Sequence, residues 1–250
     1  NDIVLAPSEM SLTLNENEVL GKNPLLLNSK RGKVNNSFET PFYKKSVVKN
    51  QYNFLILNFK NNFSIEYRAF DDGVAYRFIT NKKGQITVQD EQVSLNFDKD
   101  YKTLIPYVRD LRNPKDPYIS SFESHYESKK ISEFAKDTIA FLPFLIDFES
   151  HKKAVFLEAN LQDYPGLFVT NNGDKTGFIS RFSKYPLAET NGGFNFLNKL
   201  IAKRADYLVQ TKGTREFPWR IFVISEKDSD LANSDMVQKL SEPSKIKDIS

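Results

Sequence analysis

The sequence contains no cysteine, and this absence excludes several kinds of chemistry. Disulfide bonds, thiol nucleophiles and thiolate metal sites are ruled out, although the compartment is left open. No apolar run approaches the ~20 residues needed to cross a bilayer, so we expect no membrane span. Nucleophile-elbow and phosphate-binding glycine motifs are also missing, because Gly192-Gly193 is an isolated pair.

A large charge of one sign is missing as well. The 250 residues include 35 basic and 32 acidic side chains, which are interspersed and give a net charge of +3. This balance offers no electrostatic basis for binding nucleic acid, so no such partner is expected. The opening residues, NDIVLAPSEM, lack the basic and apolar regions of a secretory signal. We expect that any such signal has been removed or was never present.

Aromatic residues and turn signals are abundant, with 21 Phe and 11 Tyr. Short alternating segments and apolar runs rich in β-branched and aromatic residues predict strands along most of the chain. Asp71-Asp72-Gly73 predicts a hairpin turn, and residues 81–84 predict a second turn. The predicted strands cover residues 11–14, 53–59, 63–70, 74–80, 85–89, 92–97, 122–126, 139–148 with a break at Pro143, 177–182 and 219–224. Antiparallel sheets packed face to face are therefore expected.

One stretch, AVFLEANLQDYPGLFVT at residues 154–170, combines two apolar ends with a polar middle. Both ends favour extended chain, and we expect them to form a hairpin. The middle contains Glu158, Asn160 and Asp163, and Pro165 stiffens the backbone before a glycine that permits a turn. The pattern predicts a strand that ends in a carboxylate and continues into a rigid loop.

Three motifs occur in order along the chain: DGVAYRF at 72–78, EANLQDYPG at 158–166 and TREFPWRI at 214–221. This set resembles the N-terminal domain of glycoside hydrolase family 97, in which the middle motif reads E-A-D-L-x-D-Y-P-G. The likeness covers most of the chain and is strongest from about residue 71. Asn160 stands where the family has an acid, so a charge is missing beside the loop. The resemblance implies an all-β fold, a large two-sheet antiparallel β-super-sandwich of the galactose mutarotase-like kind.

The chemistry that the resemblance implies centres on Glu158. In the family, the glutamate of this motif ligates a calcium ion, while the other ligands and the catalytic acid come from a following (β/α)₈ barrel. Calcium takes about 6–8 oxygen ligands, so a carboxylate on a stiff loop can help to bridge two domains. The resemblance gives this chain one metal ligand and no catalytic residue. Asn160 and Asp163 are left open as contacts to metal or substrate.

The resemblance also implies the surroundings of the domain. Residues 1–243 would form the N-terminal sandwich, and residues 244–250 a linker toward its own C-terminal catalytic barrel. The full-length enzyme would act on an oligosaccharide as an α-glucosidase or α-galactosidase, in a periplasmic or secreted location with its signal peptide removed. The choice between these substrates, and between retention and inversion, depends on barrel residues.

Three segments are harder to assign. The apolar residues of 197–202 fall at helical spacing, and we leave this segment as helix or strand. The resemblance places a strand ahead of the FPWR sequence, so we expect one at 205–210. Residues 190–193 are expected to form a loop, and Ser229 can N-cap a helix over 230–240.

Two other classes of function remain open. A carbohydrate-binding module would need exposed aromatic side chains on one sheet face, and a glycan array would test it. An aldose mutarotase-like enzyme would share the sandwich, but His125 and His151 are far apart in the sequence and have no evident acidic partner. An anomer-exchange assay would test this alternative. We interpret both histidines as structural or surface residues, Trp219 as a core aromatic and Arg220 as a strand partner.

Overall fold

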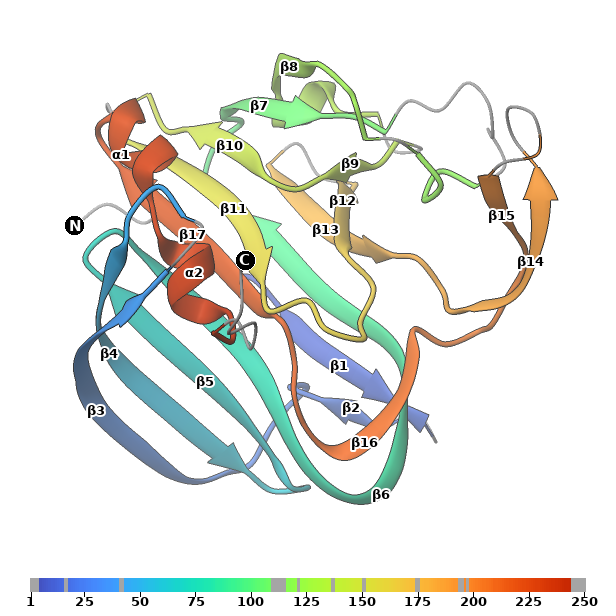
Figure 1. The fold of residues 1–250 in the computed structure, drawn as a ribbon, viewed down its shortest axis with the longest axis horizontal. Coiled ribbons are helices and arrows are strands. Elements are labelled where there is room, and N and C mark those ends of the chain that lie inside the picture. The colour runs from blue at the N-terminus through green and yellow to red at the C-terminus, as the bar shows by residue number, and fades with distance from the viewer. Residues whose placement is uncertain are drawn as a thin grey trace, which may run out of the picture.

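The computed structural model describes residues 5–15, 18–40, 43–108, 116–120, 122–135, 138–149, 152–173, 176–192, 196 and 198–243. These residues form one continuous antiparallel sheet folded into two layers, two short α-helices, one 3₁₀-helix (Ile131–Glu133) and a separate two-stranded ribbon (Figure 1). The expected all-β, two-sheet antiparallel β-super-sandwich is confirmed. No helix in this part of the chain is long and apolar enough to cross a membrane.

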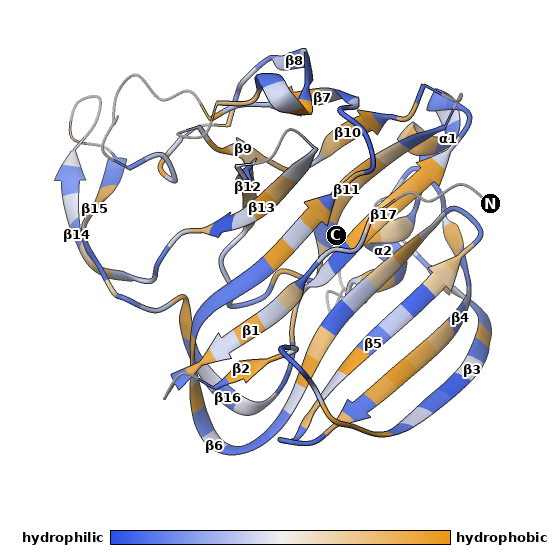
Figure 2. Ribbon diagram, turned by 180° about the vertical axis from the view of Figure 1, so that it is seen from behind, coloured by the Kyte–Doolittle hydropathy of each residue, from blue (hydrophilic) through white to orange (hydrophobic). Residues whose placement is uncertain are grey.

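The first layer consists of neighbouring strands that pair antiparallel from one edge to the other. Figure 2 shows hydrophobic and hydrophilic bands in turn along β5, and side-chain exposure alternates along most of β4, which is typical of a sheet with one covered face. In spatial order the strands are β3 (Leu26–Glu39), β4 (Val47–Phe59), β5 (Phe63–Phe70), β6 (Gly73–Asn96), β17 (Trp219–Ser225), β11 (Lys153–Ala159), β10 (Phe144–Asp147), β7 (Lys102–Pro106) and β8 (Tyr126–Lys130).

The second layer forms around the C-terminal half of β6. Strand β1 pairs with this half on one side, and β16 and β13 pair with it on the other. Strand β2 extends the layer beyond β1, while β12 and then β9 extend it beyond β13. These strands are β1 (Met10–Leu14), β2 (Val19–Leu20), β9 (Ala140–Phe141), β12 (Leu167–Asn171), β13 (Gly177–Phe182) and β16 (Val209–Glu216).

Strand β6 runs continuously through the segment 81–84, so the turn expected there is wrong. Strand β16 pairs with β6 both before and after this segment and holds it extended. The pair bends at a bulge in β6, where residues 82–84 face the single residue Gly213 of β16 and Gly84 has a φ of 71°. At that bulge a Cβ on Gly213 would lie 2.5 Å from the Lys82 carbonyl oxygen. A bulge adds curvature without ending the pairing, so β6 passes from one layer into the other.

Two hydrophobic cores lie on opposite faces of the first layer. The larger core fills the space between the layers, and its fully buried aromatic residues include Phe78, Phe144, Phe156 and Phe178. The smaller core lies under the helices. It consists of Phe70, Ala75, Ala159, Trp219, Ile221, Val223, Met236 and Leu240.

The helices are α1 (Asp228–Asn233) and α2 (Met236–Leu240). The single helix expected over 230–240 is therefore wrong, and its expected cap is wrong too, because Lys227 rather than Ser229 occupies the N-cap position. Both helices pack on the outer face of β17 and β11 (Figure 1).

The break between the helices coincides with a tertiary contact at Asp235. Its carboxylate accepts a hydrogen bond from the Tyr43 hydroxyl at 2.9 Å and one from Lys45 Nζ at 2.5 Å. Both donors come from the segment between β3 and β4, so the contact ties the helical region to a distant part of the first layer.

The apolar ends of the stretch 154–170 do not form the expected hairpin. Strand β11 pairs with β10 and β17, whereas β12 pairs with β13 and β9. The polar segment between β11 and β12 therefore connects the two layers instead of joining neighbouring strands.

The ribbon consists of β14 (Pro186–Gly192) and β15 (Asn198–Arg204), and it protrudes at one end of the molecule (Figure 1). Residues 198–202 are thus strand, because pairing with β14 prevails over the helical spacing. The loop expected at 190–193 is wrong for residues 190–192, which lie in β14. The strand expected at 205–210 begins only at Val209.

Candidate functional site

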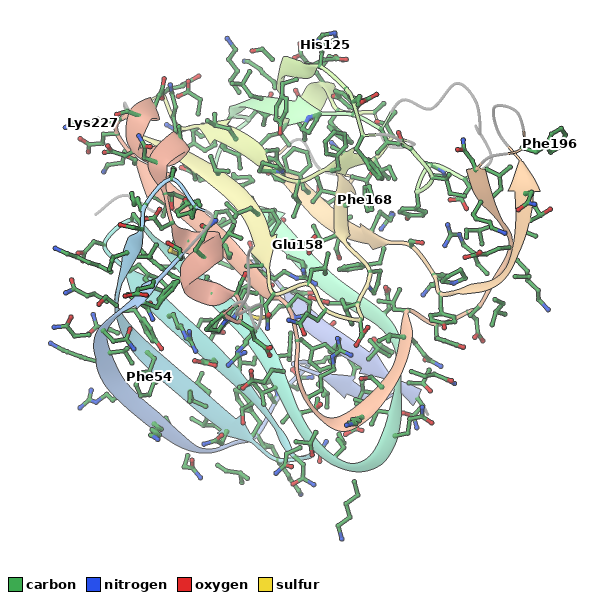
Figure 3. The ribbon with its side chains drawn as sticks, viewed as in Figure 1. Phe54, His125, Glu158, Phe168, Phe196 and Lys227 are labelled. Carbon is green, nitrogen blue, oxygen red and sulfur yellow. The ribbon has the colours of Figure 1, made fainter. Side chains whose placement is uncertain are left out.

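Glu158 is the next-to-last residue of β11, on the face that looks toward the second layer. Ala154 and Phe156 precede it by four and two residues and are fully buried in the larger core, so side-chain alternation places Glu158 on the same face. Its cross-strand partner on β17 is Arg220. Figure 3 shows Glu158 near the end of β11, where the strand leads into the loop toward β12.

Two groups hold the Glu158 carboxylate in place. Arg220 Nη1 donates to Oε2 at 2.5 Å, and the backbone N–H of Leu167 donates to Oε1 at 3.1 Å and to Oε2 at 3.3 Å. A Cβ on Gly166 would lie 3.4 Å from Oε1, so the glycine of the loop passes directly over this oxygen. The side chain is 15% exposed. The strand-end carboxylate of the sequence prediction is therefore a half-buried, oriented group.

A second carboxylate, Glu91, binds the same arginine and was not identified from the sequence. Arg220 donates from Nε to Glu91 Oε1 at 2.9 Å and from Nη2 to Oε2 at 2.7 Å, a two-bond arrangement typical of strong Arg–carboxylate pairs. Glu91 lies in the C-terminal half of β6, so Arg220 joins the two layers. Both partners are almost completely buried.

One signal in the sequence could have identified Glu91. Glu91 lies one residue before the strand predicted at 92–97, in which Val93 and Leu95 occupy alternate positions and are buried in the core. Glu91 therefore occupies an inward position of an alternating strand, where a lone carboxylate is unfavourable and predicts a buried cation nearby.

Burial has the largest effect on the pKa of Glu158 and raises it above the ordinary value, because the ionised form loses contact with water. The positive charge of Arg220 and the Leu167 N–H oppose this rise, since both favour the ionised form. The negative charge of Glu91 adds to the rise. A positive charge placed beside Glu158 would stabilise its ionised form and so lower its pKa.

The loop after β11 adopts two left-handed residues, Asn160 (φ 56°) and Asp163 (φ 47°), a conformation that Asn and Asp tolerate better than most side chains. Tyr164 anchors the loop in the core, edge-on to Phe217 with 5.5 Å between ring centroids. Arg215 Nη2 donates to the Asp163 carbonyl oxygen at 3.1 Å. The loop is thus fixed on both sides, as the Tyr-Pro-Gly sequence predicts.

The structure does not bring Glu158 and Asp163 into contact through any described hydrogen bond. Asp163 is exposed and lines a groove of about 1110 Å³, and Glu158, whose side chain points between the layers, is not among the residues that line it. Asn160 accepts hydrogen bonds from Gln162 and from the backbone of Glu242. The two acids are therefore not arranged as a pair across one substrate bond.

The described residues contain no group of three or more His, Cys, Asp or Glu side chains that could hold a metal ion. Glu158 can nevertheless supply one ligand. A carboxylate oxygen has two lone pairs, and Oε1 accepts only the Leu167 N–H in the hydrogen bonds described. His125 is exposed just before β8, and His151 lies outside the described residues.

Comparison with known proteins gives concordant results. The family model described as Glycosyl-hydrolase 97 N-terminal matches residues 1–243. A retaining alpha-galactosidase of Bacteroides thetaiotaomicron is 34% identical over 249 residues, covering 99% of this chain and 38% of that protein. The chain thus spans less than two fifths of the length of this curated relative.

Solved structures show the same fold at lower identity. A glycoside hydrolase family 97 enzyme from Pseudoalteromonas sp. strain K8, in complex with acarbose, has a TM-score of 0.78 at 20% identity and covers 99% of this chain and 35% of its own. A beta-arabinopyranosidase has a TM-score of 0.73 at 18% identity, with 90% of this chain and 35% of its own covered. In both structures the matched part is a minor share of a longer chain.

Proposed function

The chain belongs to the glycosyl-hydrolase 97 N-terminal family, and from this membership we propose that it is the non-catalytic N-terminal domain of a calcium-dependent α-glycosidase. In this proposal the domain packs on its own C-terminal catalytic barrel and supplies one metal ligand, Glu158. The enzyme would act on an oligosaccharide as an α-galactosidase or α-glucosidase. The name of the curated relative and the fraction of its length that this chain covers support the first part.

The observation that carries the metal assignment is the state of the Glu158 carboxylate. It is oriented by Arg220 and Leu167, it keeps a lone pair on Oε1, and its side chain is 15% exposed. Calcium prefers about 6–8 oxygen ligands, so the residues described here fit one position of its shell and not the whole site. The remaining ligands would come from the barrel.

The bound ion would orient the substrate and stabilise developing negative charge. The contribution of this chain is to hold one oxygen at a fixed place through the stiff loop and the arginine. Glu242 donates its N–H to Asn160 Oδ1 at 3.4 Å, so the last described residues lie beside the same loop. This contact supports a barrel that packs at the Glu158 end of the sandwich.

Measuring the rate of α-glycoside hydrolysis against free calcium in the full-length protein tests the proposal. Glu158→Gln keeps the shape of the side chain but removes its charge, so the variant should need more calcium for half-maximal activity while its fold is retained. Glu123→Gln, which changes an exposed carboxylate, is the matched control. Superimposable calcium curves for the wild type and Glu158→Gln would disprove the metal assignment.

A periplasmic or secreted location, with the signal peptide removed, is part of the same proposal. It is supported by the oligosaccharide substrate, which this proposal assigns to the parent enzyme. Fractionation of cells that produce the full-length protein tests it, and an exclusively cytoplasmic distribution would contradict it.

A carbohydrate-binding role is the second candidate, and the larger groove favours it. Tyr118, Phe122, Phe168 and Tyr185 line this groove, and Tyr185 is 45% exposed. Exposed aromatic rings can stack on sugars. A glycan array probed with this chain and with Tyr185→Ala tests the role, and equal signals from the two proteins would remove the groove from consideration.

A further inference from the structure

Glu91 is a buried carboxylate that the proposed function does not use. It comes from β6 in the second layer, yet its side chain reaches Arg220 of the first layer. Together with Glu158 these residues form what we call the Arg220 cluster: Glu91, Arg220 and Glu158. The guanidinium lies between the two carboxylates and binds both.

The cluster contains more negative than positive charge. With both glutamates ionised, one guanidinium faces two carboxylates, which leaves a net charge of −1 inside the sandwich. Glu91 takes two of the three bonds that Arg220 makes, and Glu158 takes only one. The charge of Arg220 is therefore matched mainly by Glu91, the more buried acid.

We propose that Glu91 is a positioning residue for cation binding at Glu158, because it orients and neutralises Arg220 so that the Glu158 charge stays available to a divalent cation. This inference rests on the proposed function. Without Glu91, Arg220 could turn both of its terminal nitrogens to Glu158 and form a neutral pair. A neutral pair attracts a calcium ion far less than an uncompensated carboxylate does.

The experiment is isothermal titration calorimetry of the full-length protein with calcium. Glu91→Gln should weaken calcium binding by about two orders of magnitude, the effect of removing one unit charge about 10 Å from a divalent ion at an effective dielectric constant near 20. Glu66→Gln is the matched control, because Glu66 is equally buried and also binds arginine, but on the opposite face of the first layer. Its calcium affinity should equal that of the wild type.

A double variant separates the charge effect from simple damage to the core. Glu91→Leu combined with Arg220→Met removes one charge of each sign and leaves the net charge at −1. Replacing a buried ion pair by apolar residues of similar volume is often tolerated. The double variant should therefore bind calcium more tightly than Glu91→Gln does, because the Glu158 charge is again uncompensated, and more weakly than the wild type, because Arg220 no longer orients Glu158.

The possible outcomes distinguish this inference from the proposed function. If Glu158→Gln leaves calcium affinity unchanged, the proposed metal ligand is wrong and this inference fails with it. If Glu158→Gln weakens binding but Glu91→Gln does not, only this inference is overturned. It is also overturned if the double variant binds as weakly as Glu158→Gln, a result that remains measurable even where Glu91→Gln fails to fold.

Discussion

Two arginine clusters lie on opposite faces of the first layer, and neighbouring residues of β17 anchor them. Arg220 points between the layers and forms the cluster described above. Trp219 points outward, and the guanidinium carbons of Arg68 and Arg77 lie 4.5 and 4.4 Å from the centroid of its ring. The outer group, which we call the Arg77 cluster, is completed by two acids and consists of Arg68, Arg77, Glu66 and Glu216.

The two clusters differ in charge balance. In the Arg77 cluster two arginines face two glutamates, and Glu216 is 55% exposed, so water shares the stabilisation of its charge. In the Arg220 cluster one arginine faces two glutamates, and Arg220 itself is 1% exposed. A balanced cluster needs no explanation beyond packing and ion pairing. A buried excess of negative charge is unfavourable by itself, and this difference is the basis of the cation proposal above.

Removing the central arginine should change the free energy of unfolding by very different amounts in the two clusters, and this is the largest effect that we expect. Arg220→Met leaves two buried carboxylates without a cation and should destabilise the fold by about 3–5 kcal/mol. Arg77→Met should cost less, about 1–2 kcal/mol, because Glu66 keeps its bond to Arg68 and Glu216 can turn to water. Urea unfolding followed by circular dichroism measures both changes.

The control for Arg220→Met is the double variant Glu91→Leu with Arg220→Met. It should recover most of the stability lost in Arg220→Met. Equal shifts of the unfolding midpoint in Arg220→Met and Arg77→Met would contradict the difference in charge balance between the two faces.

Trp219→Leu should have the next largest effect on the free energy of unfolding. It changes the outer face of the first layer and leaves the Arg220 cluster intact. The substitution leaves a cavity in the smaller core and removes two cation–π contacts, so we expect a loss of about 2–3 kcal/mol in unfolding free energy. Because Trp219 faces away from Glu158, calcium affinity of the full-length protein should stay unchanged. A variant that unfolds at lower urea and also binds calcium more weakly would show that the two faces are coupled.

Much of the fold could be predicted from local pattern. The Asp-Gly turn, strand β5 and strand β13 were predicted at their observed bounds, because each depends on residues close in sequence. The continuous path of β6 could not be predicted, since β16, more than a hundred residues away, holds it extended. The helix break likewise coincides with the contacts of Asp235 to Tyr43 and Lys45, which no local pattern connects to it.

In the candidate site too, contacts between residues far apart in the sequence could not be predicted. Glu158 was identified because an apolar strand, a carboxylate and a stiff loop follow one another in a recognisable motif. Arg220 was predicted as a strand partner, and it pairs with Glu158 as a cross-strand neighbour. Glu91 was missed because its partner lies 129 residues away on the other layer. Only its inward register, in a strand of otherwise apolar inward residues, pointed to it.

The smallest expected effect concerns Asp235, which lies outside both clusters. Burial tends to raise the pKa of this carboxyl, but the hydrogen bonds from Lys45 and Tyr43 and the Lys45 charge outweigh burial and hold the pKa below its ordinary value. An acid with a lowered folded-state pKa adds stability above its unfolded pKa of about 3.9, and this stability is lost as the pH falls through the lowered value.

Asp235→Asn should therefore cost about 1 kcal/mol at neutral pH, the usual contribution of a charge-assisted hydrogen bond at a partly exposed site. The difference in unfolding free energy between wild type and variant should hold from pH 8 to about pH 5 and shrink at lower pH, as Asp235 becomes protonated in the wild type. Urea unfolding across this range measures it, with Asp230→Asn on the exposed face of α1 as the control. A difference that stayed constant down to the acid unfolding of the protein would show that Asp235 stabilises the fold through shape and not through charge.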